Sequence, residues 1–153
     1  MSMAPSSPPA RVSIDPMVVG DLPAVAAIAS SLHVDEGQLR DELARPWSVM
    51  QVARETESGV VAFMVAWRVA DELHVLQVAT REDRRRCGIA RTLMERVLAD
   101  GRRMGMRYAF LEVRCSNLPA LAFYRSLGFE VGRVRRGYYT DGEDAVEMML
   151  DVR

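Results

Sequence analysis

The sequence predicts one α/β domain with a mixed central sheet that is flanked by helices. Residues 60–69 are rich in Val and aromatic residues, and residues 72–80 alternate between two faces, as in strands, while apolar residues recur at helical spacing from Ile89 to Leu98. Three predicted strands follow one another before the first strand–loop–helix crossover, so the order differs from a plain dinucleotide-binding fold. A chain of 153 residues is long enough to bury one substantial core.

The first half of the chain is predicted to combine four strands with two short helices. Asp21 can cap the first helix, and Pro46 ends the second. Both faces of the strand at 72–80 carry apolar residues, so this strand is expected in the centre of the sheet. The predicted strands are 12–19, 48–54, 60–69 and 72–80, and the predicted helices are 21–32 and 36–44.

The second half is predicted to continue as helix, strand, helix and two final strands. The helix at 89–104 stops before Gly105, and the helix that Asn117 caps ends at Gly128. Pro119 falls in the first turn of that helix, where its missing N–H costs little. The predicted strands are 108–114, 129–134 and 145–152. The Ser- and Pro-rich residues 1–10 predict a disordered tail ahead of a single domain at 11–153.

Composition excludes several classes of function. The net charge is -1, so no overall field draws the chain to nucleic acid or to a membrane. No apolar run approaches the ~18 residues of a membrane span, and the N-terminal residues lack the apolar segment of a secretory signal, so a cytoplasmic protein is expected. Cys87 and Cys115 each fall within a predicted element and are expected to be buried, reduced thiols. His33 and His74 lack a second ligand at metal-binding spacing, so no metal site is expected, and His74 is expected in the core.

A basic loop that opens a helix is the strongest local signal. Arg81 through Cys87 follow a predicted strand, and Gly88 precedes the helix. A helix N-terminus has unpaired N–H groups and a partial positive charge, and small residues let its backbone approach a phosphate closely. The pattern indicates a pyrophosphate site, and a solvated basic loop before an ordinary helix is the alternative. Neither the Gly-rich dinucleotide fingerprint nor a Walker motif occurs, so a phosphorylated cofactor of another class is expected.

The loop and the C-terminal half together resemble a known family. The segment Arg85-Arg86-Cys87-Gly88-Ile89-Ala90 is similar to the acetyl-CoA pyrophosphate motif of the GNAT N-acetyltransferases. Two further segments, LEVRCSNLPALAFYRSLGFE at 111–130 and RRGYYTDGEDA at 135–145, resemble the RimI branch. RimI enzymes acetylate the N-terminal alanine of a small-subunit ribosomal protein. The resemblance runs from about Val12 to Leu150 and is specific from Leu73 onward.

The resemblance implies a role for each residue that matches the family motif. Glu112 matches the general base and Tyr124 the general acid, for direct attack without an acetyl-enzyme. Taken alone, Glu112 is more simply a solvated side chain and Tyr124 a packing residue. Asn117 and Tyr124 are seven residues apart, so they share one face of a helix. The implied acetyl-CoA contacts are the backbone of Gln77, Val78 and Ala79, the loop residues Arg85, Arg86, Cys87, Gly88, Ile89 and Ala90, and Asn117.

The loop at 138–144 is the candidate acceptor site. Tyr138 and Tyr139 precede three carboxylates, a combination that suits a peptide N-terminus with a basic tail, although a hairpin with solvated acids has the same composition. The arginines at 133, 135 and 136 are interpreted as a solvated face, and no direct nucleic-acid binding is expected. Residues 32–36 stand where many family members carry Pro-Trp-Ser/Thr, so the acceptor wall is expected to differ.

Three functions are compatible with these residues. The leading hypothesis is an acetyl-CoA-dependent enzyme that acetylates the N-terminal amine of a protein, with a ribosomal protein as candidate partner. The second keeps the fold and the donor but uses a small-molecule amine, such as a polyamine or an aminoglycoside. The third is a non-catalytic acyl-CoA sensor, which would need neither Glu112 nor Tyr124.

Overall fold

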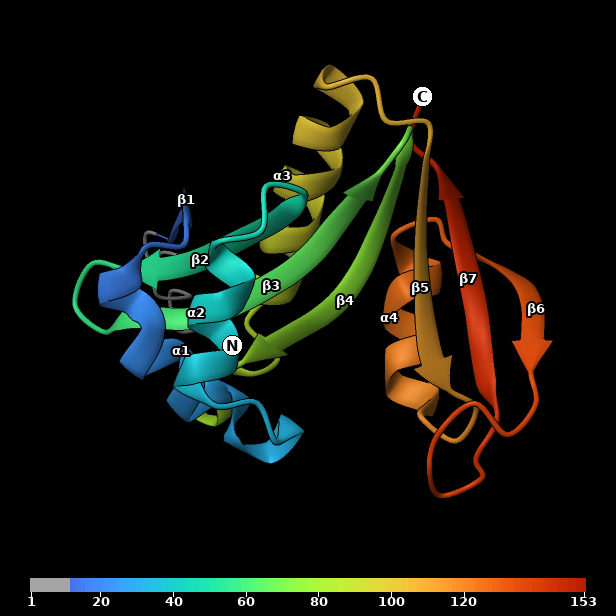
Figure 1. The fold of residues 1–153 in the computed structure, drawn as a ribbon, viewed down its shortest axis with the longest axis horizontal. Coiled ribbons are helices and arrows are strands. Elements are labelled where there is room, and N and C mark those ends of the chain that lie inside the picture. The colour runs from blue at the N-terminus through green and yellow to red at the C-terminus, as the bar shows by residue number, and fades with distance from the viewer. Residues whose placement is uncertain (1–11) are drawn as a thin grey trace, which may run out of the picture.

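A computed structural model describes residues 12–153, so the predicted tail at residues 1–10 lies outside the described residues. The described residues form a seven-stranded sheet with the order β1-β2-β3-β4-β5-β7-β6 (Figure 1). Neighbouring strands are antiparallel except for β4 and β5, which are parallel. The strands are β1 Val12–Pro16, β2 Ser48–Glu55, β3 Gly59–Val69, β4 Glu72–Thr80, β5 Tyr108–Arg114, β6 Glu130–Arg135 and β7 Ala145–Asp151. The α-helices are α1 Leu22–Ile28, α2 Glu36–Leu43, α3 Ile89–Arg103 and α4 Leu118–Ser126.

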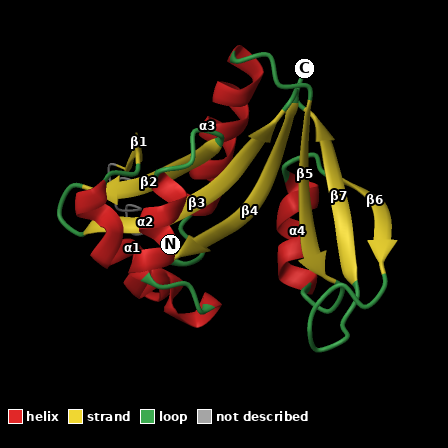
Figure 2. Cartoon of the chain, viewed as in Figure 1, coloured by secondary structure: helices red, strands yellow, loops and turns green. Residues whose placement is uncertain are grey.

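Helices cover both faces of the sheet, and each layer has its own core (Figure 2). In this view α1 and α2 lie in front of the β1–β4 half, while α3 and α4 lie behind the sheet. Leu93, Met94 and Met148 are fully buried in the core behind the sheet. Leu22 and Phe63 are fully buried in the core beneath α1 and α2. The predicted mixed sheet with flanking helices is confirmed, including the central position of β4.

β4 and β5 pair at only one end and then diverge (Figure 1). Their parallel register covers residues 72–74 and 108–110. Just past this point Val75 and Gln77 pair with neighbouring residues of β3, which leaves Leu76 as an extra residue on β4. A β-bulge of this kind bends its strand and increases the local twist. The bend turns β4 away from β5 and opens the sheet between them.

Three predictions near the N-terminus were wrong. β1 ends at Pro16 rather than at residue 19, and α1 ends at Ile28, where the chain continues as a 3-10 turn. Asp21 does not cap α1 with its side chain. Its carboxylate instead accepts a hydrogen bond from the Val18 N–H at 3.0 Å and pairs with Arg54 of β2 at 3.0 Å. A tertiary ion pair has therefore taken the carboxylate that the sequence pattern assigned to a local cap.

The cysteines and His74 are more exposed than predicted. Cys87 and Cys115 are unpaired, as expected, but both lie in loops beyond the ends of their elements and are exposed. The His74 side chain is 36% exposed, contacts Glu72 at 2.9 Å and stacks on Phe110. His74 is not a core residue, because the apolar neighbours Leu73 and Val75 take the buried face of β4.

Candidate active site

A cavity of about 590 Å³ lies beside the diverging end of β4. Its walls come from the end of β4, the loop before α3, the first turns of α3 and α4, and the 3-10 turn Ala29–Leu32. Seven of the ten residues predicted to contact acetyl-CoA line it, namely Val78, Ala79, Arg85, Arg86, Gly88, Ile89 and Ala90. The fold therefore brings the strand and the basic loop to one cavity.

The loop before α3 is shaped to receive an anion. Gly88 is the N-cap of this 15-residue helix and has a φ of 77°, a left-handed conformation that glycine adopts without strain. Arg86 also has a positive φ, 64°, which costs a side-chain-bearing residue about 1 kcal/mol. A Cβ added at Gly88 would meet no atom within 4 Å. The unpaired N–H groups of the helix thus lie behind open space, with a partial positive charge.

The arginines of this loop fall into two groups. Arg84 pairs with the buried Glu55 of β2 at 2.9 Å, which fastens the loop to the sheet. Arg85 and Arg86 are exposed and form no ion pair within residues 12–153. Arg85 donates one hydrogen bond from Nε to the Thr80 carbonyl at 3.5 Å, which leaves its terminal N–H groups for a ligand. Two guanidinium groups without an ion pair and an open helix N-terminus suit a pyrophosphate, because phosphate oxygens accept charge-assisted hydrogen bonds from both kinds of donor.

The other three predicted cofactor residues do not line this cavity. Gln77 faces a smaller cavity, beside α2. Cys87 directs its thiol at the Arg85 carbonyl, 3.6 Å away. Asn117 accepts a hydrogen bond from the Ala120 N–H at 3.2 Å, so the predicted N-cap of α4 is confirmed. Its contact with a cofactor stays a prediction.

Several wall residues escaped the sequence reasoning. Ser31 and Leu32 reach the cavity because the segment after α1 folds over the sheet, and no local pattern marks them. Arg91 lies with its guanidinium carbon 5.9 Å from the ring centroid of Phe123 and donates a hydrogen bond to Ser126, so it ties α3 to α4. Its position in the first turn of the helix, three residues after Gly88, was a usable signal for a phosphate-site arginine.

Glu112 lies on the part of β5 that has parted from β4. Its neighbours Leu111 and Val113 are buried in the core that contains α4, so strand alternation places Glu112 on the opposite face. The side chain is partly buried. Within residues 12–153 it forms no ion pair or side-chain hydrogen bond, although Arg114 lies two residues away and pairs with Glu143 instead. The diverging strands therefore carry a carboxylate without a protein partner.

Tyr124 belongs to the other face. It projects from α4 into the core behind the sheet, with its ring 5.9 Å from Phe129, edge to face, and 5.1 Å from Phe123. Burial raises the pKa of Tyr124 above its usual value of 10.0. The hydroxyl is therefore protonated at neutral pH and is able to donate a proton. Glu112 and Tyr124 thus lie on opposite sides of the sheet.

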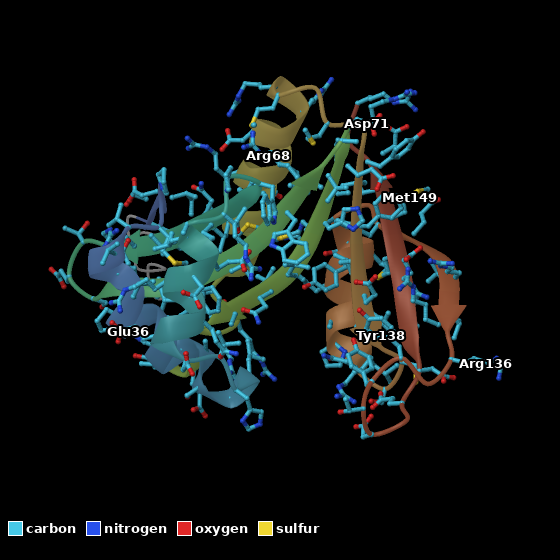
Figure 3. The ribbon with its side chains drawn as sticks, viewed as in Figure 1. Glu36, Arg68, Asp71, Arg136, Tyr138 and Met149 are labelled. Carbon is cyan, nitrogen blue, oxygen red and sulfur yellow. The ribbon has the colours of Figure 1, made fainter. Side chains whose placement is uncertain are left out.

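The β6–β7 loop brings Tyr139 near Glu112. Tyr138 and Tyr139 pack edge to face at 5.1 Å, and the guanidinium carbon of Arg114 lies 4.0 Å from the Tyr139 ring centroid. Burial raises the pKa of Tyr139, Arg114 opposes the increase, and the charge of Glu112 adds to it. Tyr139 and Glu112 therefore share one side of the sheet. Tyr138 is 47% exposed and lies on the loop itself (Figure 3).

Comparison with known proteins decides the family. Residues 22–129 match the model of the Acetyltransferase (GNAT) family. The chain belongs to this family. Structural comparison agrees with this assignment. A crystal structure of the ribosomal-protein-S18-alanine N-acetyltransferase from Escherichia coli superposes on this chain with a TM-score of 0.83 and 31% identity, and the match covers 93% of this chain and 94% of that one.

Curated relatives of this GNAT chain are named as N-acetyltransferases. It is 34% identical over 154 residues to the ribosomal protein bS18-alanine N-acetyltransferase of Escherichia coli (strain K12), across 92% of this chain and 97% of that protein. It is 45% identical over 76 residues to an N-alpha-acetyltransferase of Saccharolobus solfataricus, across 49% of this chain and 46% of that protein. The predicted RimI-like resemblance is confirmed, and the chain is an N-acetyltransferase.

Helix α2 and strand β4 line a second cavity in this acetyltransferase. A cavity of about 300 Å³ is lined by Leu76 and Gln77 of β4 and by residues of α2 that include Gln38 and Asp41. Asp35 and Gln38 cap α2 reciprocally, with hydrogen bonds of 2.8 and 2.9 Å. The segment that departs from the family pattern thus starts α2 and shapes this wall.

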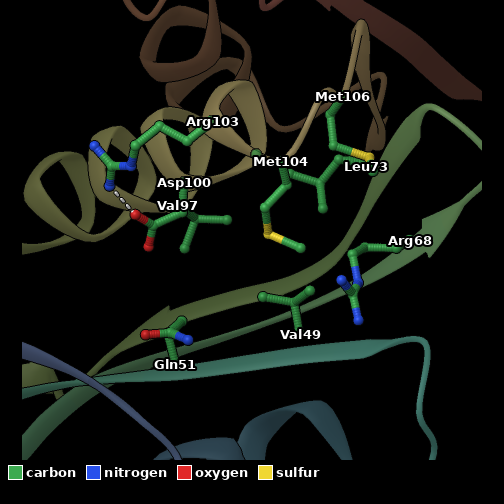
Figure 4. A pocket seen from close by; sticks show the side chains of 10 residues that line it. Val49, Gln51, Arg68, Leu73, Val97, Asp100, Arg103, Met104 and Met106 are labelled. Atoms are coloured by element: carbon green, nitrogen blue, oxygen red, sulfur yellow. Dashed lines mark hydrogen bonds and ion pairs between the residues drawn. The ribbon is translucent and has the colours of Figure 1, made fainter.

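A third cavity, of about 260 Å³, lies between the C-terminal half of α3 and strands β2 and β3 (Figure 4). Its lining is largely apolar, with Val97, Leu73 and Met104, and Arg103 pairs with Asp100 at its rim. None of the predicted site residues lines it.

Two properties of the described residues concern membranes and metal ions. Across residues 12–153, no helix combines the length and apolarity that crossing a bilayer requires. The same residues bring no three His, Cys, Asp or Glu side chains together in a way that would hold a metal ion.

Proposed function

We propose that this chain transfers an acetyl group from acetyl-CoA to the N-terminal α-amine of a protein, with Glu112 as general base and Tyr124 as general acid. The proposed acceptor is the N-terminal alanine of a small-subunit ribosomal protein. The bS18-alanine specificity of a relative that matches 92% of this chain supports this choice. The catalytic unit is a single domain over residues 11–153, and it works in the cytoplasm.

The unpaired state of Glu112 is the observation that carries the proposal. Three arginines lie on the same face of the C-terminal strands, and each pairs with a carboxylate other than Glu112. A partly buried carboxylate that forms no ion pair with any of these three arginines is free to accept a proton from an incoming amine. A solely structural carboxylate in this setting would be expected to pair with one of them.

The cavity residues fit acetyl-CoA, which would supply the acetyl group as a thioester. The α3 N-terminus with Gly88 would hold the pyrophosphate, together with Arg85 and Arg86. β4 lacks a β5 neighbour beyond residue 74, so the main chain from Gln77 to Ala79 has room to bind an extended chain along its edge. Asn117 would add a contact from the start of α4.

The two proposed catalytic groups divide the proton transfers between the two faces of the sheet. A peptide α-amine titrates near ~8, so a carboxylate acting directly or through water can remove its proton with modest help. The C–N bond forms as the C–S bond breaks. Glu112 takes one proton from the charged amine, and the departing sulfur takes a proton from the Tyr124 hydroxyl, which burial keeps protonated. The second proton, released by the nitrogen as the amide forms, returns to the Tyr124 oxygen.

The acceptor would enter on the Glu112 side, between the β6–β7 loop and α2. Tyr139 flanks Glu112, and Tyr138 extends the aromatic surface outward. Asp141 and Glu143 in the same loop, together with Asp41 on α2, suit a basic peptide tail. The first helices would then form the facing wall.

Mass spectrometry of candidate acceptors after incubation with acetyl-CoA tests the proposal. The panel holds a peptide that starts with free alanine and continues with basic residues, the same peptide with a blocked N-terminus, and a set of polyamines and aminoglycosides. One added acetyl group on the free peptide alone is expected. Acetylated small amines beside an untouched peptide would move the function to small-molecule acetylation, and transfer to no amine would favour the acyl-CoA sensor.

A further inference from the structure

Two carboxylates face each other across strands β5 and β7. The antiparallel register pairs Glu112 directly with Glu147, so both side chains project from the same face. Like charges placed opposite each other on neighbouring strands are destabilising. Glu147 is mostly buried, with 16% of its side chain exposed, so solvent does little to screen it. Positive charge nearby must therefore offset the repulsion between Glu112 and Glu147.

The compensation comes from β6, the strand beyond β7. Arg133 and Arg135 both project toward Glu147, and each lies 3.2 Å from one of its carboxylate oxygens. Arg135 also lies over the Tyr138 ring, with 5.6 Å between the guanidinium carbon and the ring centroid. Two positive charges and Glu147 therefore form one cluster beside Glu112, and the four groups sum to zero charge.

The other charged and titratable groups around Glu112 have contacts of their own. On its own strand, Arg114 is held by Asp141 at 2.8 Å and Glu143 at 3.1 Å. Tyr139 covers this side from the β6–β7 loop. Toward β4, His74 stacks on Phe110, two residues before Glu112, and contacts Glu72 at 2.9 Å. The cluster on β6 and β7 is the one that lies directly across from Glu112, because Glu147 is its register partner.

We propose that Glu147, Arg133 and Arg135 are positioning residues that keep Glu112 free and ionised as the base. This inference rests on the proposed function of Glu112. Glu147 occupies both arginines, which would otherwise reach across β7 and pair with Glu112. The arginines in turn neutralise Glu147, which would otherwise repel the charged form of Glu112. Removing Glu147 and removing one of the arginines therefore change the net charge of the cluster in opposite directions.

Opposite shifts of one titration are the signature of this arrangement. Glu147→Gln leaves an excess positive charge, so the titration midpoint of Glu112 is expected to fall. Arg135→Gln leaves an excess negative charge, so the midpoint is expected to rise. A unit charge at ~6 Å in a water-like dielectric corresponds to about half a pH unit in each direction. Arg133→Gln makes the same change at a side chain that is 60% exposed, and it serves if Arg135→Gln does not fold.

Carbon-13 NMR of glutamate-labelled enzyme measures these midpoints without turnover. The Glu112 carboxyl signal is identified by its loss in Glu112→Gln. Arg136→Gln is the matched control, because it removes the same charge from the next residue, which makes no ion pair within residues 12–153 and extends away from the sheet (Figure 3). It is expected to shift the midpoint by less than half as much as Arg135→Gln. Arg135→Lys and Glu147→Asp retain the charges and should restore most of the wild-type midpoint.

The acid limb of the pH dependence of kcat/KM should move with the NMR midpoints. Shifts in the same direction for Glu147→Gln and Arg135→Gln, or shifts no larger than that of Arg136→Gln, would overturn the proposal. Wild-type kcat in Glu112→Gln would instead refute Glu112 as the base. The NMR midpoints would still report on the charge cluster, so the two failures are distinguishable.

Discussion

Gly88 offers a sharp test of the proposed donor site. Its φ is 77°, and a side chain added there would point into open space, since no atom lies within 4 Å of the added Cβ. Gly88→Ala therefore introduces backbone strain without a clash. Gly88→Glu introduces the same strain and adds a negative charge in front of the α3 N-terminus. The two variants separate the effect of the backbone from the effect of charge.

The two contributions have different sizes. A left-handed conformation costs a side-chain-bearing residue about 1–2 kcal/mol, which lowers the melting temperature of a chain of this size by roughly 3–6 °C. This loss should be similar for both variants. A carboxylate about 5 Å from a phosphate charge costs a further ~1–3 kcal/mol of binding free energy at an effective dielectric constant between 20 and 80. Affinity for the cofactor should then be about 5–150-fold lower in Gly88→Glu than in Gly88→Ala.

Isothermal titration calorimetry with CoA measures the affinity, and thermal unfolding without ligand checks that both variants fold. CoA carries the pyrophosphate but transfers no acetyl group, so binding is measured apart from chemistry. Equal affinity of Gly88→Glu and Gly88→Ala would mean that no phosphate lies at this loop. The assignment of the pyrophosphate to Arg85, Arg86 and the α3 N-terminus would then be wrong.

Three further predictions concern the catalytic groups and the fold. Glu112→Gln should lower kcat by about 10²–10⁴-fold while CoA affinity stays within twofold of wild type, and a smaller loss would argue against general-base catalysis. Tyr124→Phe should lower kcat in the same range, and because burial raises the pKa of Tyr124, the wild-type rate should show no loss from its ionisation below about pH 10. Burial alone would raise the pKa of Asp21, but the hydrogen bonds from Arg54 and from the Val18 N–H outweigh it, so the pKa is lowered. Asp21→Asn should therefore cost about 2 kcal/mol in the free energy of unfolding at pH 7, and the difference from wild type should shrink as the pH falls below about 4, because the carboxyl of the unfolded chain takes up a proton at a higher pH than that of the folded chain. Denaturant titrations at pH 7 and pH 3 check both statements, and an unchanged difference at pH 3 would contradict them.

The order of elements and the donor loop were predictable because both are local in sequence. Alternation identifies strands and the 3.6-residue period identifies α3, and both patterns are set by which face is buried. The loop from Arg85 to Ala90 is contiguous, so its chemistry can be read without knowing the fold. The N-cap at Asn117 was predictable for the same reason, since its partner is the Ala120 N–H three residues away.

The errors arose where a distant partner competes with a local one. Asp21 has the sequence pattern of a helix cap, but Arg54, 33 residues away, takes its carboxylate. The expectation of buried thiols failed for a different reason: Cys87 precedes α3 and Cys115 follows β5, so both lie in loops outside the predicted helix 89–104 and strand 108–114. The bulge at Leu76 could not be predicted, because its position depends on the β3–β4 register rather than on the composition of β4.

The proposed donor and acceptor sites also differ in whether their residues are close together or far apart in the sequence. The proposed donor site lies mostly on one stretch, from the end of β4 to the first turn of α3, and its anion binding depends largely on the main chain. The proposed acceptor side depends on pairs that are far apart, such as Arg114 with Asp141, 27 residues away, and on a wall formed by α2. Substitutions in the β6–β7 loop or in residues 33–36 can therefore change the acceptor while CoA binding persists, whereas Leu32 also lines the donor cavity. For this reason the departure at residues 33–36 leaves the donor assignment unaffected, and acceptor identity is the property that experiment must establish first.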